Sequence, residues 1–244
     1  MKSIPILFSL ACMTALASAG EVNLFNGKNL KGWTGESGFW SAEGGVITGK
    51  TTPENAVLEN TFLVWDGEAG DFELRFKIKL VDPSGKGESY GNSGVQYRSK
   101  NVKPEYSVLS GYQADFEVGK KFSGILYEEK GRGILALRGQ KVVIHEGADP
   151  KAPKKPNIEV VGEVGNPDEI QAAIIPGDWN EYLIIAKGNH LQHFINGKLT
   201  VDVTDESSAA SKTGSIGLQL HKGAQTSRTM ILPSRNGNPR TGRV

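Results

Sequence analysis

The chain has 244 residues, with 28 Lys and Arg against 27 Asp and Glu, so its formal net charge is +1 at pH 7. Hydrophobic residues make up 38% of the sequence, which is ordinary for a folded globular protein and excludes disorder as the main state. The 31 glycines and 11 prolines predict short strands joined by many turns rather than a helical bundle.

The first 19 residues have the pattern of a secretory signal peptide. Lys2 precedes an apolar run from Ile4 to Leu16, and Ala17-Ser18-Ala19 is the small-x-small pattern at which signal peptidase cuts. The apolar run is shorter than the roughly 20 residues that a spanning helix needs. We therefore expect residues 1–19 to be removed and the protein to be exported, periplasmic or extracellular, without a membrane span.

Cys12 is the only cysteine, and it lies inside the expected signal. An exported chain without a thiol excludes disulfides, cysteine-zinc sites and cysteine nucleophiles. A lipoprotein modified at Cys12 is a minor alternative, because Ser9-Leu10-Ala11 lacks the expected aliphatic residue at its first position. Loss of Lys2 brings the basic residues level with the 27 acidic ones, which argues against a nucleic-acid or anionic-membrane partner.

A strict alternation of apolar and charged residues identifies residues 71–80 as a long, half-buried strand. Further strands are predicted within residues 94–99, 111–117, 124–129, 141–145, 181–186, 191–195, 199–203 and 215–221. Asn196-Gly197 is a strong hairpin signal between two of these runs. Only residues 167–175 have a helical pattern. Many strands without intervening helices predict an all-β, single-domain sandwich or jelly roll of two antiparallel sheets over residues 20–221.

Residues 222–244 differ from the rest of the chain in charge and pattern. They contain five basic residues and no acidic one, and Pro233, Gly237, Pro239 and Gly242 interrupt everything after the short run 230–232. We expect an atypical, disordered basic tail.

One face of a curved antiparallel sheet packs on the core, so the polar face of each strand is a candidate groove lining. The polar side chains that alternate with apolar ones are Gln96, Arg98, Gln113, Asp115, Glu117, His193, Gln219 and His221. These are hydroxyl-binding and proton-transferring groups suited to a sugar. For any single strand, an ordinary solvated sheet face is the more common alternative.

Two familiar arrangements are absent from this set. His190 and His193 are three positions apart on a predicted strand, so they point to opposite faces and do not form a zinc pair. A retaining glycosidase on this architecture would show Glu-x-Asp-x-x-Glu on one strand. Residues 113–118 read Gln-Ala-Asp-Phe-Glu-Val, so ordinary double displacement has no evident pair of carboxylates.

Several motifs together resemble the 3-keto-disaccharide hydrolase domain family. They are Leu24-Phe25-Asn26-Gly27-Lys28-Asn29-Leu30-Lys31-Gly32-Trp33, Asp71-Phe72-Glu73-Leu74, Asn92-Ser93-Gly94-Val95-Gln96-Tyr97-Arg98, Gly111-Tyr112-Gln113-Ala114-Asp115, Trp179-Asn180-Glu181-Tyr182 and Asn196-Gly197-Lys198. The resemblance runs in order from about Val22 to His221. It implies a concanavalin-like jelly roll, secretion, and action on glycosides already oxidised at C3 of the sugar.

Such a substrate explains the missing pair of carboxylates. A ketone at C3 acidifies the C2 proton, so a base can remove it, the enolate can expel the C1 group, and water can add back. We expect His193 or His221 to be the base, Arg98 to stabilise the enolate and Asp115 to be the acid. Gln96, Gln113, Glu117 and Gln219 are the expected substrate-binding residues. A divalent cation held by Asp115 with His193 or His221 is an open alternative to chemistry without a cofactor.

Relatives continue after the segment at His221 into a closing strand, whereas this chain continues with Lys222-Gly223-Ala224 and the basic tail. This departure predicts a lost strand, an exposed sheet edge and a frameshift or truncated reading frame near Lys222. A non-catalytic carbohydrate-binding module is the alternative function, and a structural or adhesive domain is a third. The four tryptophans lie beside apolar positions, which favours core packing over sugar platforms and thus the enzyme.

Overall fold

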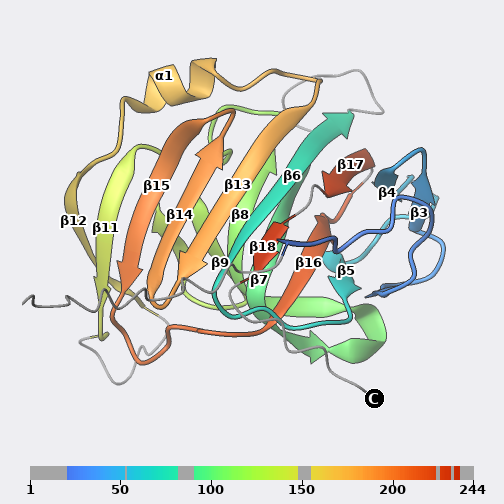
Figure 1. The fold of residues 1–244 in the computed structure, drawn as a ribbon, viewed down its shortest axis with the longest axis horizontal. Coiled ribbons are helices and arrows are strands. Elements are labelled where there is room, and N and C mark those ends of the chain that lie inside the picture. Colours follow the sequence, from blue (N-terminus) through green and yellow to red (C-terminus); the bar gives the residue numbers. More distant parts are fainter. Residues whose placement is uncertain are drawn as a thin grey trace, which may run out of the picture.

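The computed structural model describes residues 21–52, 54–81, 91–147, 155–223, 226–231 and 234–236. The expected signal peptide and Cys12 lie outside these residues. The described chain forms two facing β-sheets with one short helix at their side (Figure 1). The predicted all-β jelly-roll sandwich is therefore confirmed.

The larger sheet has 11 strands, of which nine follow the order β12-β11-β15-β14-β13-β6-β17-β4-β3. These strands are β3 (Trp40–Glu43), β4 (Val46–Lys50), β6 (Phe72–Val81), β11 (Gln140–His145), β12 (Asn157–Glu163), β13 (Asn180–Lys187), β14 (His190–Ile195), β15 (Lys198–Asp205) and β17 (Thr226–Ile231). The remaining two are β1 (Glu21–Val22) and β18 (Ser234–Asn236), which pair with each other, and β18 also pairs with β6.

The smaller sheet has seven strands in the order β10-β9-β8-β7-β16-β5-β2. They are β2 (Trp33–Thr34), β5 (Thr61–Trp65), β7 (Asn92–Lys103), β8 (Val108–Glu117), β9 (Leu126–Glu129), β10 (Gly133–Ala136) and β16 (Ser215–Leu220). A 3₁₀ turn, η1 (Pro104–Tyr106), joins β7 to β8.

The core fills the space between the two sheets, and the apolar face of β6 shows why. Its residues are alternately buried and partly exposed along almost the whole strand, as the period-two pattern predicts. Phe72 of β6 meets Tyr97 of β7 edge to face, and Phe116 of β8 meets Tyr182 of β13 in the same way. Burial of these apolar faces supplies the main driving force that holds the sheets together.

Local sequence signals explain two of the connections. Asn196 and Gly197 both have a positive φ, 47° and 78°, as a two-residue turn of the mirror-image type requires, and they link β14 to β15. The helix α1 (Pro167–Ala172) begins after Asn166, whose side chain accepts hydrogen bonds from the backbone N–H groups of Asp168 and Glu169.

One pairing departs from the antiparallel prediction. Strand β11 runs parallel to β15, while its other neighbour, β12, is antiparallel. A parallel neighbour requires a crossover, and here the chain between β11 and β15 passes through β12, α1, β13 and β14. No helix within the described ranges is long and apolar enough to cross a bilayer.

The expected loss of the closing strand is wrong. Strand β17 pairs with β6 from Thr226 opposite Val81 to Ile231 opposite Phe76, and its other edge pairs with β4. It thus lies inside the larger sheet and leaves no exposed edge between β4 and β6. The sequence analysis missed this strand because residues 226–231, which include Arg228, do not alternate between apolar and polar residues. The proposed frameshift stays an untested prediction.

Candidate active site

A pocket of about 470 Å³ opens on the face of the smaller sheet that points away from the core. Tyr112, Ala114 and Phe116 of β8 face the core, so Gln113 and Asp115 face the opposite side, as the alternation predicts. The pocket is lined by Leu58, Glu59, Asn60, Asn92, Gln113, Asp115, Phe122, Ile125, Tyr127, Glu129, Lys130, Ile134, Gln219, His221 and Lys222. Its volume lies within the range usual for small-molecule sites.

A chain of hydrogen bonds runs along the floor and ends on Asp115. The Ser99 hydroxyl donates to Oε1 of Gln96 (2.9 Å), and Nε2 of Gln96 donates to Oε1 of Gln113 (3.2 Å). Nε2 of Gln113 then donates to Oδ1 of Asp115 (2.5 Å). Each amide is thereby oriented by the one before it, so Oδ1 of Asp115 is an acceptor and a proton on this carboxyl belongs on Oδ2.

The backbone of Asp115 is fixed from the core side. Its carbonyl accepts hydrogen bonds from the Tyr182 hydroxyl (3.0 Å) and from the backbone N–H of Gly124 (3.0 Å). Tyr182 lies on the opposite sheet, so the position of the carboxyl is set by both layers of the sandwich. Opposite Asp115 on β7 stands Gly94, where a Cβ would lie 2.9 Å from Cγ of Gln113. A side chain there would displace the floor amide.

Burial raises the pKa of Asp115 to about 7, because a desolvated carboxylate is unfavourable. The hydrogen bond from Gln113 acts in the opposite direction, and the nearby Glu129 and Glu117 carboxylates add to the rise. A carboxyl with this pKa is about half protonated at neutral pH, so it can give or take a proton there.

Strand β9 contributes Tyr127 and Glu129 beside Asp115, since Tyr127 pairs with Gln113 across the ladder. Glu129 is almost fully buried and accepts a hydrogen bond from Nδ2 of Asn60 (3.2 Å). Burial, with the charges of Glu129 and Asp115, raises the pKa of the Tyr127 phenol. Tyr127 therefore stays protonated at neutral pH and acts as a hydrogen-bond donor.

A buried ion cluster holds β9 in place from the core side. Arg132 donates to Glu128 through Nε (2.7 Å) and to Asp205 of β15 through Nη2 (2.6 Å). The Tyr112 hydroxyl donates to the same oxygen, Oδ2 of Asp205 (2.5 Å). Since Glu128 directly precedes Glu129, this cluster fixes the strand that carries two of the pocket residues.

His221 stands at the pocket rim, directly after β16. Its Nδ1 lies 3.0 Å from the carbonyl oxygen of Lys222, which can only accept, so Nδ1 carries the proton and Nε2 the lone pair of the neutral ring. Oδ1 of Asn60 accepts a hydrogen bond from the backbone N–H of Lys222 (3.1 Å). Asn60 also donates to Glu129, so it links the segment after His221 to β9.

His193 is not a pocket residue, and its predicted role as base is wrong. Strand β14 buries Leu191, His193 and Ile195 on one side, so the imidazole points into the core and shares a hydrogen bond with the Tyr97 hydroxyl (2.9 Å). Burial lowers the pKa of His193 to about 3, against a small raising effect from the backbone of Ile125. The alternative of a metal ion held by Asp115 with His193 is wrong for the same reason.

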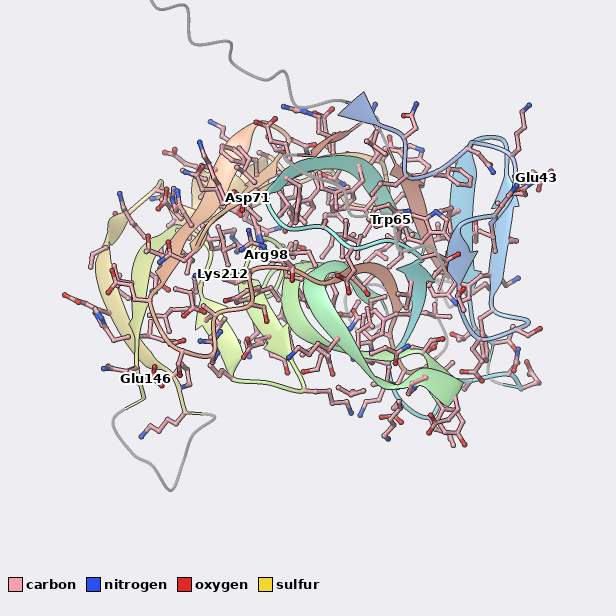
Figure 2. All side chains as sticks on the ribbon, turned by 60° about the horizontal axis from the view of Figure 1, so that its bottom comes forward. Glu43, Trp65, Asp71, Arg98, Glu146 and Lys212 are labelled. Carbon is pink, nitrogen blue, oxygen red and sulfur yellow. The ribbon has the colours of Figure 1, made fainter. Side chains whose placement is uncertain are left out.

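Arg98 is also absent from the pocket, so it cannot stabilise an enolate there. It has a positive φ of 48° at a bulge in β7, four residues beyond the position opposite Asp115. Its guanidinium donates to the carbonyls of Gly70 (2.9 Å), Gly188 (2.6 Å) and Ser211 (3.2 Å). Figure 2 shows Asp71 beside it, and Oδ1 of Asp71 accepts from Nη2 (3.1 Å). Arg98 therefore joins three loops to β7.

Two of the expected substrate-binding residues have positioning roles instead. Gln96 lies beside Gln113 on the neighbouring strand β7 and contributes to the floor chain without lining the pocket. Glu117 is outside the lining as well, and its Oε1 accepts from the backbone N–H groups of Lys121 and Phe122 at the turn after β8. Gln113 and Gln219 line the pocket, and their role in substrate binding stays a prediction.

Sequence reasoning missed Asn60, Tyr127 and Glu129. The sequence signal for Tyr127 and Glu129 was weak. Glu128, which lies between them, is charged but faces the core, so β9 does not show the alternation of apolar and polar residues. Over the described residues, no group of three or more His, Cys, Asp or Glu side chains is placed to hold a metal ion. A cation bound through Asp115 and His221 stays a prediction.

The family model of the 3-keto-alpha-glucoside-1,2-lyase-like domain matches residues 20–230 of the chain. The chain belongs to this family. Membership confirms the resemblance expected from the sequence motifs, and it places the chain among carbohydrate-related domains. The matched region extends over almost all of β17, in agreement with a fold that continues beyond His221.

Solved structures agree on the fold. Two crystal structures from Parabacteroides distasonis ATCC 8503, provisionally described as glycosyl hydrolases, are 19% and 18% identical to the chain, with TM-scores of 0.53 and 0.52. The first similarity covers 90% of this chain and 94% of that one, and the second covers 89% and 99%. No protein of curated function matches the sequence.

Proposed function

We propose that this member of the family cleaves glycosides that carry a ketone at C3 of the sugar, by elimination followed by hydration. The supporting observation is that Asp115, Glu129 and His221, three proton-transferring side chains from different segments, line one sugar-sized pocket with the donor Tyr127. The expected Glu-x-Asp-x-x-Glu pair of a retaining glycosidase is missing, whereas elimination needs only a base, an acid and a donor at the ketone.

The proposed step starts when Nε2 of His221 takes the C2 proton. The electron pair moves onto the C3 oxygen, where the Tyr127 hydroxyl donates to the enolate. The enolate then re-forms the ketone and a C1–C2 double bond, while the C1–oxygen bond breaks and Oδ2 of Asp115 protonates the leaving oxygen. Water adds at C1 and a proton returns to C2, which gives the free 3-keto sugar and the alcohol.

Asp115 has two roles in this scheme, as the acid in elimination and as the base in hydration, and its contacts support both. Gln113 occupies Oδ1, so the proton is carried by the oxygen that remains for the leaving group. A pKa of about 7 lets the same carboxyl lose its proton in elimination and activate water in hydration near neutral pH. Glu129 lies beside Asp115 as a second candidate base. The variants described below distinguish its role from that of His221.

The test is turnover of methyl 3-keto-α-glucoside and of a 3-keto-disaccharide by the purified protein in D₂O, with an enzyme-free control. Elimination and hydration place deuterium at C2 of the released sugar, whereas direct displacement leaves hydrogen there. Asp115→Asn and His221→Gln should each reduce kcat at least 100-fold. Glu181→Gln, a matched change on the exposed outer face of β13, should leave kcat unchanged.

Release of the sugar without deuterium at C2 would contradict the elimination route. A loss of activity in Glu129→Gln with full activity in His221→Gln would move the role of base from His221 to Glu129. Binding of saccharides without turnover of either substrate would favour the alternative of a non-catalytic carbohydrate-binding module. Export to the periplasm or the medium is part of the same proposal, and the size of the mature protein in a cell fractionation tests it.

A further inference from the structure

A second pocket of about 480 Å³ adjoins the candidate active site, and the two share Leu58 and Glu59 as a common wall. The second pocket is lined by Glu36, Phe39, Asn55, Ala56, Val57, Leu58, Glu59, Thr61 and Tyr106. Phe39 and Val57 are buried and form a small apolar cluster with Leu220, so the floor of this pocket belongs to the fold itself.

The wall between the pockets is held by hydrogen bonds and ion pairs of Glu59 and Asn60. Oε1 of Glu59 accepts from Nζ of Lys103 (2.6 Å), and its Oε2 accepts from Nζ of Lys130 (3.1 Å). The next residue, Asn60, is fixed to Glu129 and to the backbone of Lys222. These contacts come from three separate segments, so they restrain the backbone of the wall against collapse onto the sheet.

Leu58 in this wall is 98% exposed, although Glu59 and Asn60, which follow it, are held by the contacts described above. Tyr106 of η1 lies on the lining of the second pocket, half exposed, and its backbone carbonyl accepts from the Thr61 hydroxyl (2.9 Å). An exposed leucine and a half-exposed tyrosine beside an apolar floor, next to backbone that is held by hydrogen bonds, are typical of a ligand contact rather than of a packed core.

We infer that the second pocket receives the leaving group of the substrate and selects an apolar, aromatic one. The inference rests on the proposed function: with the sugar in the first pocket, a C1 substituent that extends past the shared wall enters the second pocket. An aromatic ring would stack on Tyr106 and cover Leu58, and the apolar floor offers few partners for the hydroxyls of a second sugar.

The experiment compares benzyl and methyl 3-keto-glucosides, whose leaving alcohols have similar acidity, so chemical reactivity does not bias the comparison. We expect kcat/KM to be about 10-fold or more higher for the benzyl substrate, mostly through KM. Leu58→Ser and Tyr106→Ser should each reduce this ratio at least threefold, and Tyr106→Ser, which is outside the first pocket, should leave the methyl substrate unchanged. Leu137→Ser, an exposed leucine outside both pockets, is the matched control.

Equal kcat/KM values for the two substrates in the wild type, or a ratio unaffected by both variants, would overturn the inference. A 3-keto-disaccharide preferred over both would assign the pocket to a sugar instead and overturn it as well. If neither substrate is cleaved, the proposed function fails, but calorimetry still tests the pocket. Benzyl 3-keto-glucoside must then bind at least threefold more weakly to Tyr106→Ser, which changes the second pocket alone, than to the wild type.

Discussion

The Tyr97 hydroxyl lies 2.9 Å from Nε2 of His193, and this hydrogen bond crosses the middle of the sandwich from the smaller sheet to the larger one. Both side chains are fully buried. His193→Leu should therefore destabilise the fold by about 1–3 kcal/mol, because it leaves the phenol unpaired, and Tyr97→Phe added to it should restore part of the loss. Urea unfolding of the two single variants and the double variant measures this coupling.

The same histidine makes stability depend on pH. Its pKa is about 3 in the fold and about 6.5 in the unfolded chain, so the unfolded state binds more protons between these values. Stability should be fully present above pH 6.5 and fall as the pH drops toward 3, by up to about 5 kcal/mol in total. His193→Leu should abolish this contribution, and a difference between variant and wild type that does not change with pH would contradict it.

Asp115→Asn should stabilise the protein while it removes activity. The raised pKa of about 7 means that the fold destabilises the ionised carboxyl relative to the unfolded chain. The gain should be absent below about pH 4, grow as the pH rises to about 7, and level off above it, on the order of 2–4 kcal/mol. Thermal unfolding across this pH range checks the sign, and Glu181→Gln on the exposed outer face should show no such trend.

Arg98→Lys should lower stability by about 2–4 kcal/mol, because a lysine ammonium cannot reproduce the fork that serves Gly70, Gly188, Ser211 and Asp71. The folded variant should keep its kcat, since this residue is outside the pocket. Arg75→Lys, on the exposed face of β6, is the control and should change stability by less than about 0.5 kcal/mol. A loss of kcat at full folding would reinstate Arg98 as part of the site.

Arg132→Met should cost about 3–5 kcal/mol, because Glu128 and Asp205 would be left as buried carboxylates without their partner. Since Glu128 precedes Glu129 on β9, we also expect a rise in KM for the 3-keto substrate. Addition of Glu128→Gln to this variant should recover part of the stability, which denaturant unfolding would detect. Equal stability of the single and double variants would show that relief of the buried charge is not the cause.

Alternation alone predicted much of the site, and its failures have physical reasons. It placed Gln113, Asp115 and Gln219 on the open face because each lies between residues of the core. His193 lies two residues from both Leu191 and Ile195, so the same rule already placed it in the core, and its polarity obscured that. Arg98 follows a bulge with positive φ, which no period-two pattern reveals.

The remaining pocket residues depend on tertiary structure. Asn60 comes from a loop before β5 and meets Glu129 only after the sheet has formed. Glu128 can face inward because Arg132, which also pairs with Asp205, neutralises it there, and no local sequence pattern predicts that ion pair. The strand β17 was missed because its place between β4 and β6 is specified by long-range pairing rather than by its own alternation.

The place of β17 also constrains how the protein is made. Strands β3 and β4 join the rest of their sheet through β17, so a nascent chain on the ribosome has two open strand edges until residue 231 has emerged. Such edges are templates for aggregation, and pairing across a large sequence separation is slow. Synthesis that stops before residue 226 should therefore yield a chaperone-dependent product rather than a smaller folded one.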